Sequence, residues 1–297
     1  MRVFLTGATG FIGSHIIPEL LGAGHQVLGM TRSERGAAAL EAAGAEPHYG
    51  DIDDLDSLHR GAAACDGIIH TAFDHDFSNY AANCARDRLA IETLGSAIEG
   101  SNRPLVITSV TGAGTVTAGE PALEDHLDVN HPNPRIVSEL TVQALSERGV
   151  NVSSVRLSQI HDTVRQGLVT EMIALARRTG VSAYIGEGLN TWSAAHVSDT
   201  VRLYRLALET PSSGARYHAT AESRITLRDI AASVGKRLDL PTVSIPQGEA
   251  PAHFGWLSAF VARDMSASSA LTQQRLGWTP VGPGLLEDIE ALESEAA

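Results

Sequence analysis

The chain has 297 residues, of which 43% are hydrophobic, and its 22 basic and 35 acidic side chains give a formal net charge of −13. This apolar content is enough for a full core and excludes a disordered chain, while the acidic balance without a basic cluster argues against nucleic-acid binding. No apolar run reaches 18 residues, so we expect no membrane-spanning helix and no membrane partner.

Short apolar runs alternate with helix-like stretches through the first half of the chain. The strands expected there are 3–5, 25–30, 46–49, 67–70, 105–108 and 150–157. The helices expected between them are 11–21, one that Ser33 caps and Gly44 ends, 55–63, 80–99 and 135–148. Because each crossover between parallel strands needs a helix, this alternation predicts an α/β fold with a doubly wound parallel sheet.

The pattern loosens after residue 157, where glycines and Pro211 separate shorter elements. Helices are expected at 225–238, 248–262 and 285–292. No internal repeat or long linker separates the two parts. We therefore expect a nucleotide-binding domain over 1–157, to which 196–219 also contributes. Residues 158–297 should form mainly a smaller C-terminal α/β lobe that binds the substrate.

A glycine-rich turn follows the first strand directly and reads Thr6-Gly7-Ala8-Thr9-Gly10-Phe11-Ile12-Gly13. Gly7 permits a tight turn, Gly10 lets the backbone approach a pyrophosphate, and Gly13 lets helix and strand pack closely. The helix that begins here presents free N–H groups and its positive dipole end to phosphates. Between a strand and an amphipathic helix, this spacing predicts a Rossmann dinucleotide site that includes Thr9, Phe11 and Ile12.

The end of the second strand reads Gly29-Met30-Thr31-Arg32-Ser33 and is followed by Arg35. No carboxylate is present to hold a ribose 2′-hydroxyl, and two guanidiniums suit a 2′-phosphate, so we expect NADP(H) to be preferred over NAD(H). Alternatively, Arg32 and Arg35 are solvated residues at the start of a helix. The acidic stretch 51–56 lacks the glycine and terminal glutamate of a calcium loop and suits a helix N-terminus instead.

With these motifs the chain resembles, over nearly its whole length, the extended or atypical branch of the short-chain dehydrogenase/reductase superfamily, often labelled NAD-dependent epimerase/dehydratase. The glycine turn has the extended form TGxxGxxG, and 196–199 and 276–280 look like two landmarks of the C-terminal lobe. The resemblance implies that Asp51 and Ile52 contact the adenine. It implies that Thr71, Ala72 and Phe73 form the alanine-containing turn after the fourth strand. It also implies that Ser158 and Gln159 belong to a segment that passes the nicotinamide. It also implies a homodimer formed through helices 80–99 and 135–148.

The resemblance breaks at the catalytic residues. The superfamily uses a Tyr and a Lys spaced YxxxK, plus a Ser or Thr at the end of the fifth strand. Arg135 and Glu139 stand at the Tyr and Lys positions, and Lys236, the single lysine, has no tyrosine four residues before it. Val110 takes the serine's place. Since the usual proton relay is missing, hydride transfer would need another proton donor or an activated substrate.

Five side chains are candidates for the shell around the nicotinamide: Ser109, Thr111, His75, Tyr80 and His161. His75 lies between two aspartates, which could raise its pKa and make it an acid near neutrality, or it belongs to a solvated loop. Tyr80 could donate a proton or serve only in packing. His161 could point into the cleft or be a hydrogen-bonded framework histidine.

Three further residues are candidates for substrate contacts. Arg135 would place a fixed cation in the cleft, suited to a carboxylate or phenolate, or it pairs with Glu139 one helical turn on. Tyr184 and Trp192 could form aromatic walls of a pocket, or they fill the core between the lobes.

Other chemistry is not indicated. The scattered histidines predict no metal site, and Cys65 and Cys84 exclude a disulfide framework and suit a reducing cytoplasm. Met1 enters a short apolar run without a basic segment, so we expect no secretory signal. The leading hypothesis is a cytoplasmic NADP(H)-dependent oxidoreductase that reduces a small carbonyl or conjugated substrate. The alternatives are an isomerase, epimerase or dehydratase that keeps its cofactor bound, and a non-catalytic protein that senses NADP(H).

Overall fold

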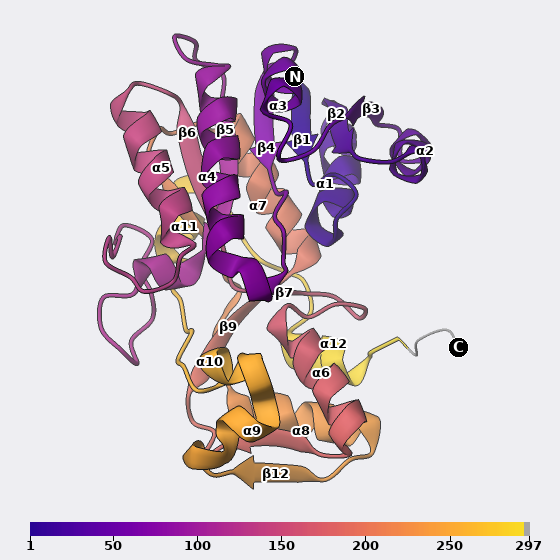
Figure 1. Ribbon diagram of the computed structural model, residues 1–297, viewed down its shortest axis with the longest axis vertical. Helices are drawn as coiled ribbons and strands as arrows, with labels where there is room; N and C mark the ends of the chain where they lie inside the picture. The colour runs from indigo at the N-terminus through magenta and orange to yellow at the C-terminus, as the bar shows by residue number, and fades with distance from the viewer. Residues whose placement is uncertain (294–297) are drawn as a thin grey trace.

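The computed structural model describes residues 1–293, and its larger domain is built on a seven-stranded parallel sheet (Figure 1). The strand order is β10-β6-β5-β4-β1-β2-β3. The strands are β1 (Arg2–Thr6), β2 (Gln26–Thr31), β3 (Glu46–Tyr49), β4 (Gly67–His70), β5 (Leu105–Val110), β6 (Val152–Leu157) and β10 (Arg216–Ala219). The doubly wound α/β fold expected from the strand–helix alternation is therefore confirmed, and six of the seven strands lie where they were predicted.

Helices cover both faces of this sheet, and successive side chains of one strand explain why. Val3 and Leu5 point to one face, where their cluster includes residues of helices α1 (Phe11–Gly22) and α7 (Val197–Glu209). Phe4 points to the other face and joins a cluster with α3 (Leu55–Ala63), α4 (Tyr80–Ser96) and α5 (Ile136–Glu147). Helix α2 (Glu34–Ala42) is capped by Ser33, whose hydroxyl accepts the N–H of Gly36 at 3.1 Å.

The chain leaves the larger domain after β6 and returns to it with α7 and β10. Helix α7 packs against α1, and β10 pairs in parallel with β6, with Arg216 opposite Ser154. The edge of the sheet beyond β6 is thus completed by a strand that follows much of the smaller lobe in the sequence.

The smaller lobe lies below the sheet domain in Figure 1 and has its own core, around Trp192 and Ile230. One sheet has the order β11-β9-β7, and a parallel pair joins β12 to β8. The strands are β7 (Gln159–His161), β8 (Ser182–Ile185), β9 (Thr191–His196), β11 (Glu222–Thr226) and β12 (Thr242–Ile245). The helices are α6 (Leu168–Thr179), α8 (Leu227–Leu238), α9 (Ala250–Phe254), α10 (Ser258–Val261) and α12 (Leu285–Glu290), while α11 (Ala270–Leu276) contacts β10.

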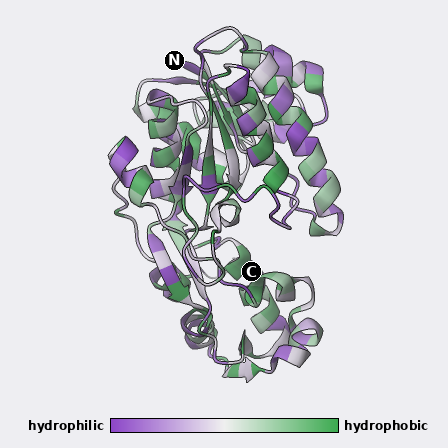
Figure 2. Cartoon of the chain, turned by 90° about the vertical axis from the view of Figure 1, so that its left-hand side faces the viewer, coloured by the Kyte–Doolittle hydropathy of each residue, from purple (hydrophilic) through white to green (hydrophobic). Residues whose placement is uncertain are grey.

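The single helix expected over 248–262 is wrong. Helix α9 ends at Phe254, because Gly255 follows with a φ of +55° that is incompatible with a continuing helix, and a 3-10 turn (Gly255–Leu257) precedes α10. No helix in the described residues is long and apolar enough to cross a membrane. Figure 2 shows apolar segments running through the strands in the interior of the sheet domain.

Candidate active site

Strands β1 and β4 are neighbours at the point where the order of the sheet reverses, and Thr6 pairs with His70 at their carboxyl ends. Ligands of doubly wound sheets bind at such a switch point. The glycine turn follows β1 there. Gly7 has a φ of +68°, and a Cβ on it would lie 2.7 Å from the backbone nitrogen of Ala72. A Cβ on Gly13 would lie 2.1 Å from the carbonyl oxygen of Gly7, so neither position can carry a side chain without moving the backbone.

The first turn of α1 is available to an anion. Its N-cap is Gly10, which has no side chain to accept the N–H groups of the first turn, and Thr9 and Gly10 are exposed. Phe11 and Ile12 are partly buried. The turn therefore fits the diphosphate of a dinucleotide, which these N–H groups and the positive end of the helix dipole would hold.

Arg32 and Asp51 are brought together at the carboxyl ends of β2 and β3. An Nη1 nitrogen of Arg32 lies 3.6 Å from Oδ2 of Asp51, and the Arg32 side chain is 81% exposed. Arg35 is exposed one turn further on, and Ile52 is partly buried beside Asp51. Two exposed guanidiniums thus lie at the edge where an adenosine ribose would be expected, and one of them, that of Arg32, pairs with Asp51.

The turn after β4 is fastened to the end of β1. The Thr71 hydroxyl donates to the carbonyl of Thr6 at 2.8 Å, and the Ala72 N–H donates to the Thr6 hydroxyl at 3.3 Å. Phe73 follows, and its ring lies under the Arg135 guanidinium, 3.7 Å from carbon to centroid. These contacts bring the β4 turn, the glycine turn and the start of α5 to one edge of the sheet.

Arg135 is buried and paired with Asp87, and the alternative pairing with Glu139 is not what the structure has. It is 4% exposed, donates to the carbonyl of Thr108 at 3.0 Å and lies 3.3 Å from the carboxylate of Asp87. Glu139 does not contact it. Arg135 is thus held as a structural cation at the position of the superfamily's tyrosine rather than left free for a carboxylate or phenolate.

Asp87 is the centre of a buried polar chain that sequence reasoning missed. It accepts hydrogen bonds from Ser138 at 2.7 Å and pairs with His70 at 3.1 Å, whose other ring nitrogen lies 2.7 Å from the Thr6 hydroxyl. Burial by itself would raise the pKa of Asp87, but the Arg135 cation and the hydrogen bond from His70 outweigh it and hold this pKa below its ordinary value. The sequence did hold one sign of this buried polar group: Asp87 lies three residues before Ala90, within the apolar face of α4.

Glu139, at the position of the superfamily's lysine, is fully buried between arginines. Its Oε2 lies 2.7 Å from Nη2 of Arg156 and 3.0 Å from Nε of Arg216. Burial would raise the pKa of Glu139, but the two cations lower it more. Burial and the Arg156 cation lower the pKa of neighbouring His218 to about 3. Both relay positions are therefore occupied by side chains committed to buried ion pairs.

Ser109 and Thr111 are buried at the end of β5, with 1% and 5% exposure. The Ser109 hydroxyl has no hydrogen-bond partner within the described part of the chain. Tyr80, the first residue of α4, is partly buried, and burial raises its pKa to about 12. Ser109 is thus the candidate whose hydroxyl has hydrogen-bonding capacity left over, on a side chain that is almost fully buried.

Of the two alternatives for His75, the raised pKa is contradicted, and the residue lies exposed in its loop. Desolvation and the Arg135 cation lower the pKa of this imidazole. Its flanking carboxylates are engaged elsewhere, since Asp74 pairs with Arg86 at 3.1 Å and Asp76 accepts the N–H of Ser78 at 3.0 Å.

Three candidates lie inside the smaller lobe instead of facing the glycine turn. His161 is fully buried, with Nδ1 2.6 Å from Oδ2 of Asp288, which is the framework arrangement. Trp192 is also fully buried in the lobe core, and its indole N–H donates to the carbonyl of Arg263 at 3.2 Å. Tyr184 is half-buried on β8 and packs against the same core. This burial favours the alternatives, a framework role for His161 and a core-filling role for Trp192.

Ser158 and Gln159 follow β6 and use their side chains internally. The Ser158 hydroxyl donates to the carbonyl of Ala219 at 2.5 Å, and the Gln159 side-chain oxygen accepts the N–H of Leu168 at 2.8 Å.

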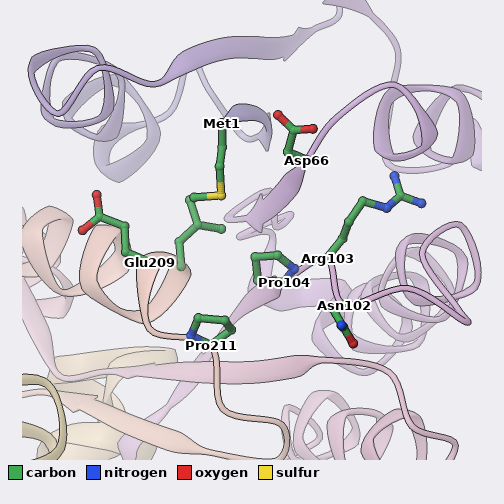
Figure 3. Close-up of a pocket in the computed structure, with 8 residues that line it drawn as sticks. Met1, Asp66, Asn102, Arg103, Pro104, Glu209 and Pro211 are labelled. Carbon is green, nitrogen blue, oxygen red and sulfur yellow. The ribbon is translucent and has the colours of Figure 1, made fainter.

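A shallow cavity of about 350 Å³ lies at the opposite edge of the sheet (Figure 3). It is lined by residues that precede β1, β4 and β5, among them Met1, Asp66 and Pro104, and by the end of α7. Since ligands of this fold bind at the carboxyl ends of the strands, this cavity is not the candidate active site.

Comparison with known proteins agrees with this geometry. The model of the NAD dependent epimerase/dehydratase family matches residues 3–220. The chain belongs to this family. Family members are enzymes that bind a nicotinamide cofactor, and they include reductases, epimerases and dehydratases.

The family's relatives include a Schizosaccharomyces pombe protein described only as uncharacterized, 47% identical over 97% of this chain and 98% of its own. A Stigmatella aurantiaca ketoreductase of a farnesylated quinoline oxide is 26% identical over 86% of this chain and 80% of its own. Among solved structures, the dTDP-glucose 4,6-dehydratase DesIV of Streptomyces venezuelae, with NAD and TYD bound, has a TM-score of 0.76. It is 20% identical, with 98% of this chain and 96% of that chain covered, and so shows the shared fold.

Proposed function

We propose that this protein is an NADP(H)-dependent oxidoreductase that reduces a small carbonyl or conjugated substrate without the Tyr/Lys relay. The observation that carries the proposal is the pairing of Arg135 with Asp87 beside the glycine turn, at the position where the family's tyrosine would act. A bound nicotinamide would supply the hydride, and the residues described below would orient the substrate and manage its charge.

The nature of Arg135 favours reduction over chemistry that begins with an oxidation. Removing hydride from an alcohol requires a base for the hydroxyl proton, and a guanidinium, with a pKa above about 12, cannot serve as one. Adding hydride to a carbonyl or enone needs no such base and builds negative charge on oxygen, which a hydrogen-bond donor stabilises. The unpartnered Ser109 hydroxyl could donate a hydrogen bond to that oxygen. Epimerisation and dehydration through an oxidised intermediate are correspondingly disfavoured.

The preference for NADP(H) rests on the end of β2. Arg32 and Arg35 are exposed there, and residues 29–33 at the end of the strand contain no carboxylate to hold a ribose 2′-hydroxyl. Glu34, between the two arginines, accepts a hydrogen bond from the Tyr49 hydroxyl at 2.8 Å. A 2′-phosphate would gain charge-assisted hydrogen bonds from these guanidiniums.

Titration of the purified protein with NADPH and NADH tests the cofactor assignment. We expect tighter binding of NADPH, and an Arg32→Ala variant that loses about tenfold in affinity for NADPH, since a hydrogen bond to a charged group contributes roughly 1.5 kcal/mol. Arg178→Ala, an exposed arginine on α6 of the smaller lobe, serves as the control and should bind both cofactors normally. Equal affinities for the two cofactors in the wild type would contradict the assignment.

Turnover tests the reaction class. NADPH consumption with any member of a panel of aldehydes, ketones and enones would support reduction. Conversion of substrate without net change in the cofactor would instead indicate an epimerase or dehydratase. Tight cofactor binding without turnover on any compound would indicate a protein that senses NADP(H).

We also propose that two copies pair through α4 and α5. A shallow groove of about 330 Å³ runs between these helices, and Leu89 and Leu140 are exposed along them. Light scattering of the wild type and of Leu89→Glu tests the pairing: the wild type should be a dimer and the variant a monomer, whereas a monomeric wild type would exclude it.

A further inference from the structure

A set of aromatic rings connects the two domains next to Arg135. The segment between β4 and α4 contributes Phe73 and Phe77, and the segment between α9 and α10 contributes Trp256. The Phe77 and Trp256 rings are stacked, with centroids 4.8 Å apart and planes inclined by 17°, and Phe260 meets both edge-on at 6.0 Å. Tyr80 links Phe77, at 5.3 Å, to Phe73, at 6.1 Å. The rings therefore form a continuous path from the Arg135 guanidinium to the smaller lobe.

Trp256 is exposed in a way that a core residue is not. Its exposure is 45%, whereas the other two tryptophans of the chain, Trp192 and Trp278, are 0% and 1% exposed. An indole that only closed the lobe would be buried like these two. Trp256 instead offers free aromatic surface while it stacks on a ring of the other domain.

Both members of the stack lie on short turns. Phe77 begins a three-residue 3-10 turn (Phe77–Asn79), and Trp256 lies in the turn that follows Gly255. Short 3-10 turns have poorer hydrogen bonds than long helices and open at low cost. The Phe77 ring can therefore move away from Trp256 without disturbing the sheet, whereas Trp256 is held by its neighbour Leu257, which is buried in the lobe core.

The charges beside the rings are already neutralised. Arg86 pairs with Asp53 and Asp74, and Arg135 pairs with Asp87. Neither arginine is free to bind an anionic group. The surface that remains is aromatic apart from the exposed Asp76 carboxylate, which accepts hydrogen bonds from Ser78 and Asn79, and it favours a planar apolar ligand over a phosphorylated one.

We propose that the Phe77–Trp256 pair binds an aromatic or extended conjugated ring of the substrate, with the reducible carbonyl directed along the rings toward Arg135 and Ser109. This inference rests on the proposed function and specifies its substrate class. A ring of the substrate stacks on the free face of Trp256 or enters between the two rings, where offset stacking holds it parallel to them. Trp256 is then a specificity residue, because it contacts the substrate away from the reacting carbonyl.

The ratio of kcat/KM for an aryl substrate to that for an alkyl substrate tests whether Trp256 recognises a substrate ring, because a merely structural role of Trp256 would not change this ratio. Aryl and alkyl aldehydes of matched size are compared by kcat/KM in the wild type, Trp256→Leu and Trp256→Phe. We expect the wild type to favour the aryl compound and Trp256→Leu to lose about three- to tenfold of that preference, the size of an aromatic stacking contribution. Trp256→Phe should retain most of it, and the Kd for NADPH should be unchanged in both. Leu189→Ser, an exposed apolar residue elsewhere in the lobe, is the control. An unchanged aryl-to-alkyl ratio in Trp256→Leu would overturn the proposal.

Tryptophan fluorescence separates failure of recognition from failure of the reaction. Because the other two tryptophans are buried, an aryl carbonyl that stacks on Trp256 should quench the emission of the wild type but not that of Trp256→Phe. If no compound consumes NADPH but this difference in quenching is present, the proposed reaction is wrong and the aromatic site stands. Equal quenching in the two proteins would refute the site whether or not turnover occurs.

Discussion

Replacing Glu139 by glutamine tests whether a buried ion pair holds the position of the missing lysine. The glutamine side chain has nearly the same shape and keeps an oxygen that can accept a hydrogen bond, so the substitution removes mainly the charge. Arg156, which is fully buried, would then lack its carboxylate partner, and Arg216 would lose the same oxygen.

The magnitude follows from the burial of the pair. Removing one partner of a buried ion pair costs about 3–5 kcal/mol, because the other charge is left without compensation. Arg156 keeps a hydrogen bond to the carbonyl of His126 at 3.0 Å, so we expect Glu139→Gln to fall near the lower end, at about 3 kcal/mol. Glu139→Lys would place a third cation beside Arg156 and Arg216, and we expect it not to fold. Restoring the YxxxK spacing by substitution at these positions alone should therefore fail.

Urea unfolding at neutral and acidic pH measures this contribution. The folded-state pKa of Glu139 is lowered, so its stabilising effect is complete above the unfolded value of about 4.3 and is lost as the pH falls through the folded value. The difference between wild type and Glu139→Gln should thus be full at pH 7 and shrink below about pH 4. Glu147→Gln, at the exposed end of the same helix, is the control and should change stability by less than about 0.5 kcal/mol. A loss below about 1 kcal/mol in Glu139→Gln at pH 7 would refute the reasoning.

Three further predictions concern the site and its surroundings. Gly7→Ala should abolish detectable cofactor binding in calorimetric titration, because the added Cβ would lie 2.7 Å from the backbone of Ala72. Gly24→Ala is the control: Gly24 also has a positive φ but has open space around it, so this variant should bind the cofactor normally. Ser109→Ala should lower kcat about tenfold or more without reducing the melting temperature, because it removes a hydroxyl that has no protein partner; an unchanged kcat would exclude a role in the reaction. His218 is held neutral with a pKa of about 3, so the stability of the wild type should fall as the pH drops below about 6.5, by up to roughly 1.4 kcal/mol per pH unit. In urea unfolding, His218→Gln should show a weaker dependence of stability on pH. Equal slopes in the two proteins would contradict this prediction.

Local pattern was sufficient for the elements of the nucleotide-binding half. The glycine spacing, the Ser33 cap and the apolar runs each act within a few residues, and the strands 46–49 and 67–70 lie where they were expected. The smaller lobe was less readable because its elements are short and interrupted. Helix α6 went unassigned although Val169, Met172 and Ile173 recur at helical spacing, and Gly255 divided a stretch that composition alone made helical.

Composition also fixed one point by itself: Lys236 is the single lysine and has no tyrosine four residues before it, so the chain contains no YxxxK pair. What replaces it depended on contacts between residues far apart in the sequence. Arg135 could be placed at the tyrosine's position from the motif, but its partner Asp87 lies 48 residues away on another helix. The stack of Phe77 on Trp256 joins segments from different domains. Such pairings are decided by packing and by the need to neutralise buried charge, which no local pattern encodes.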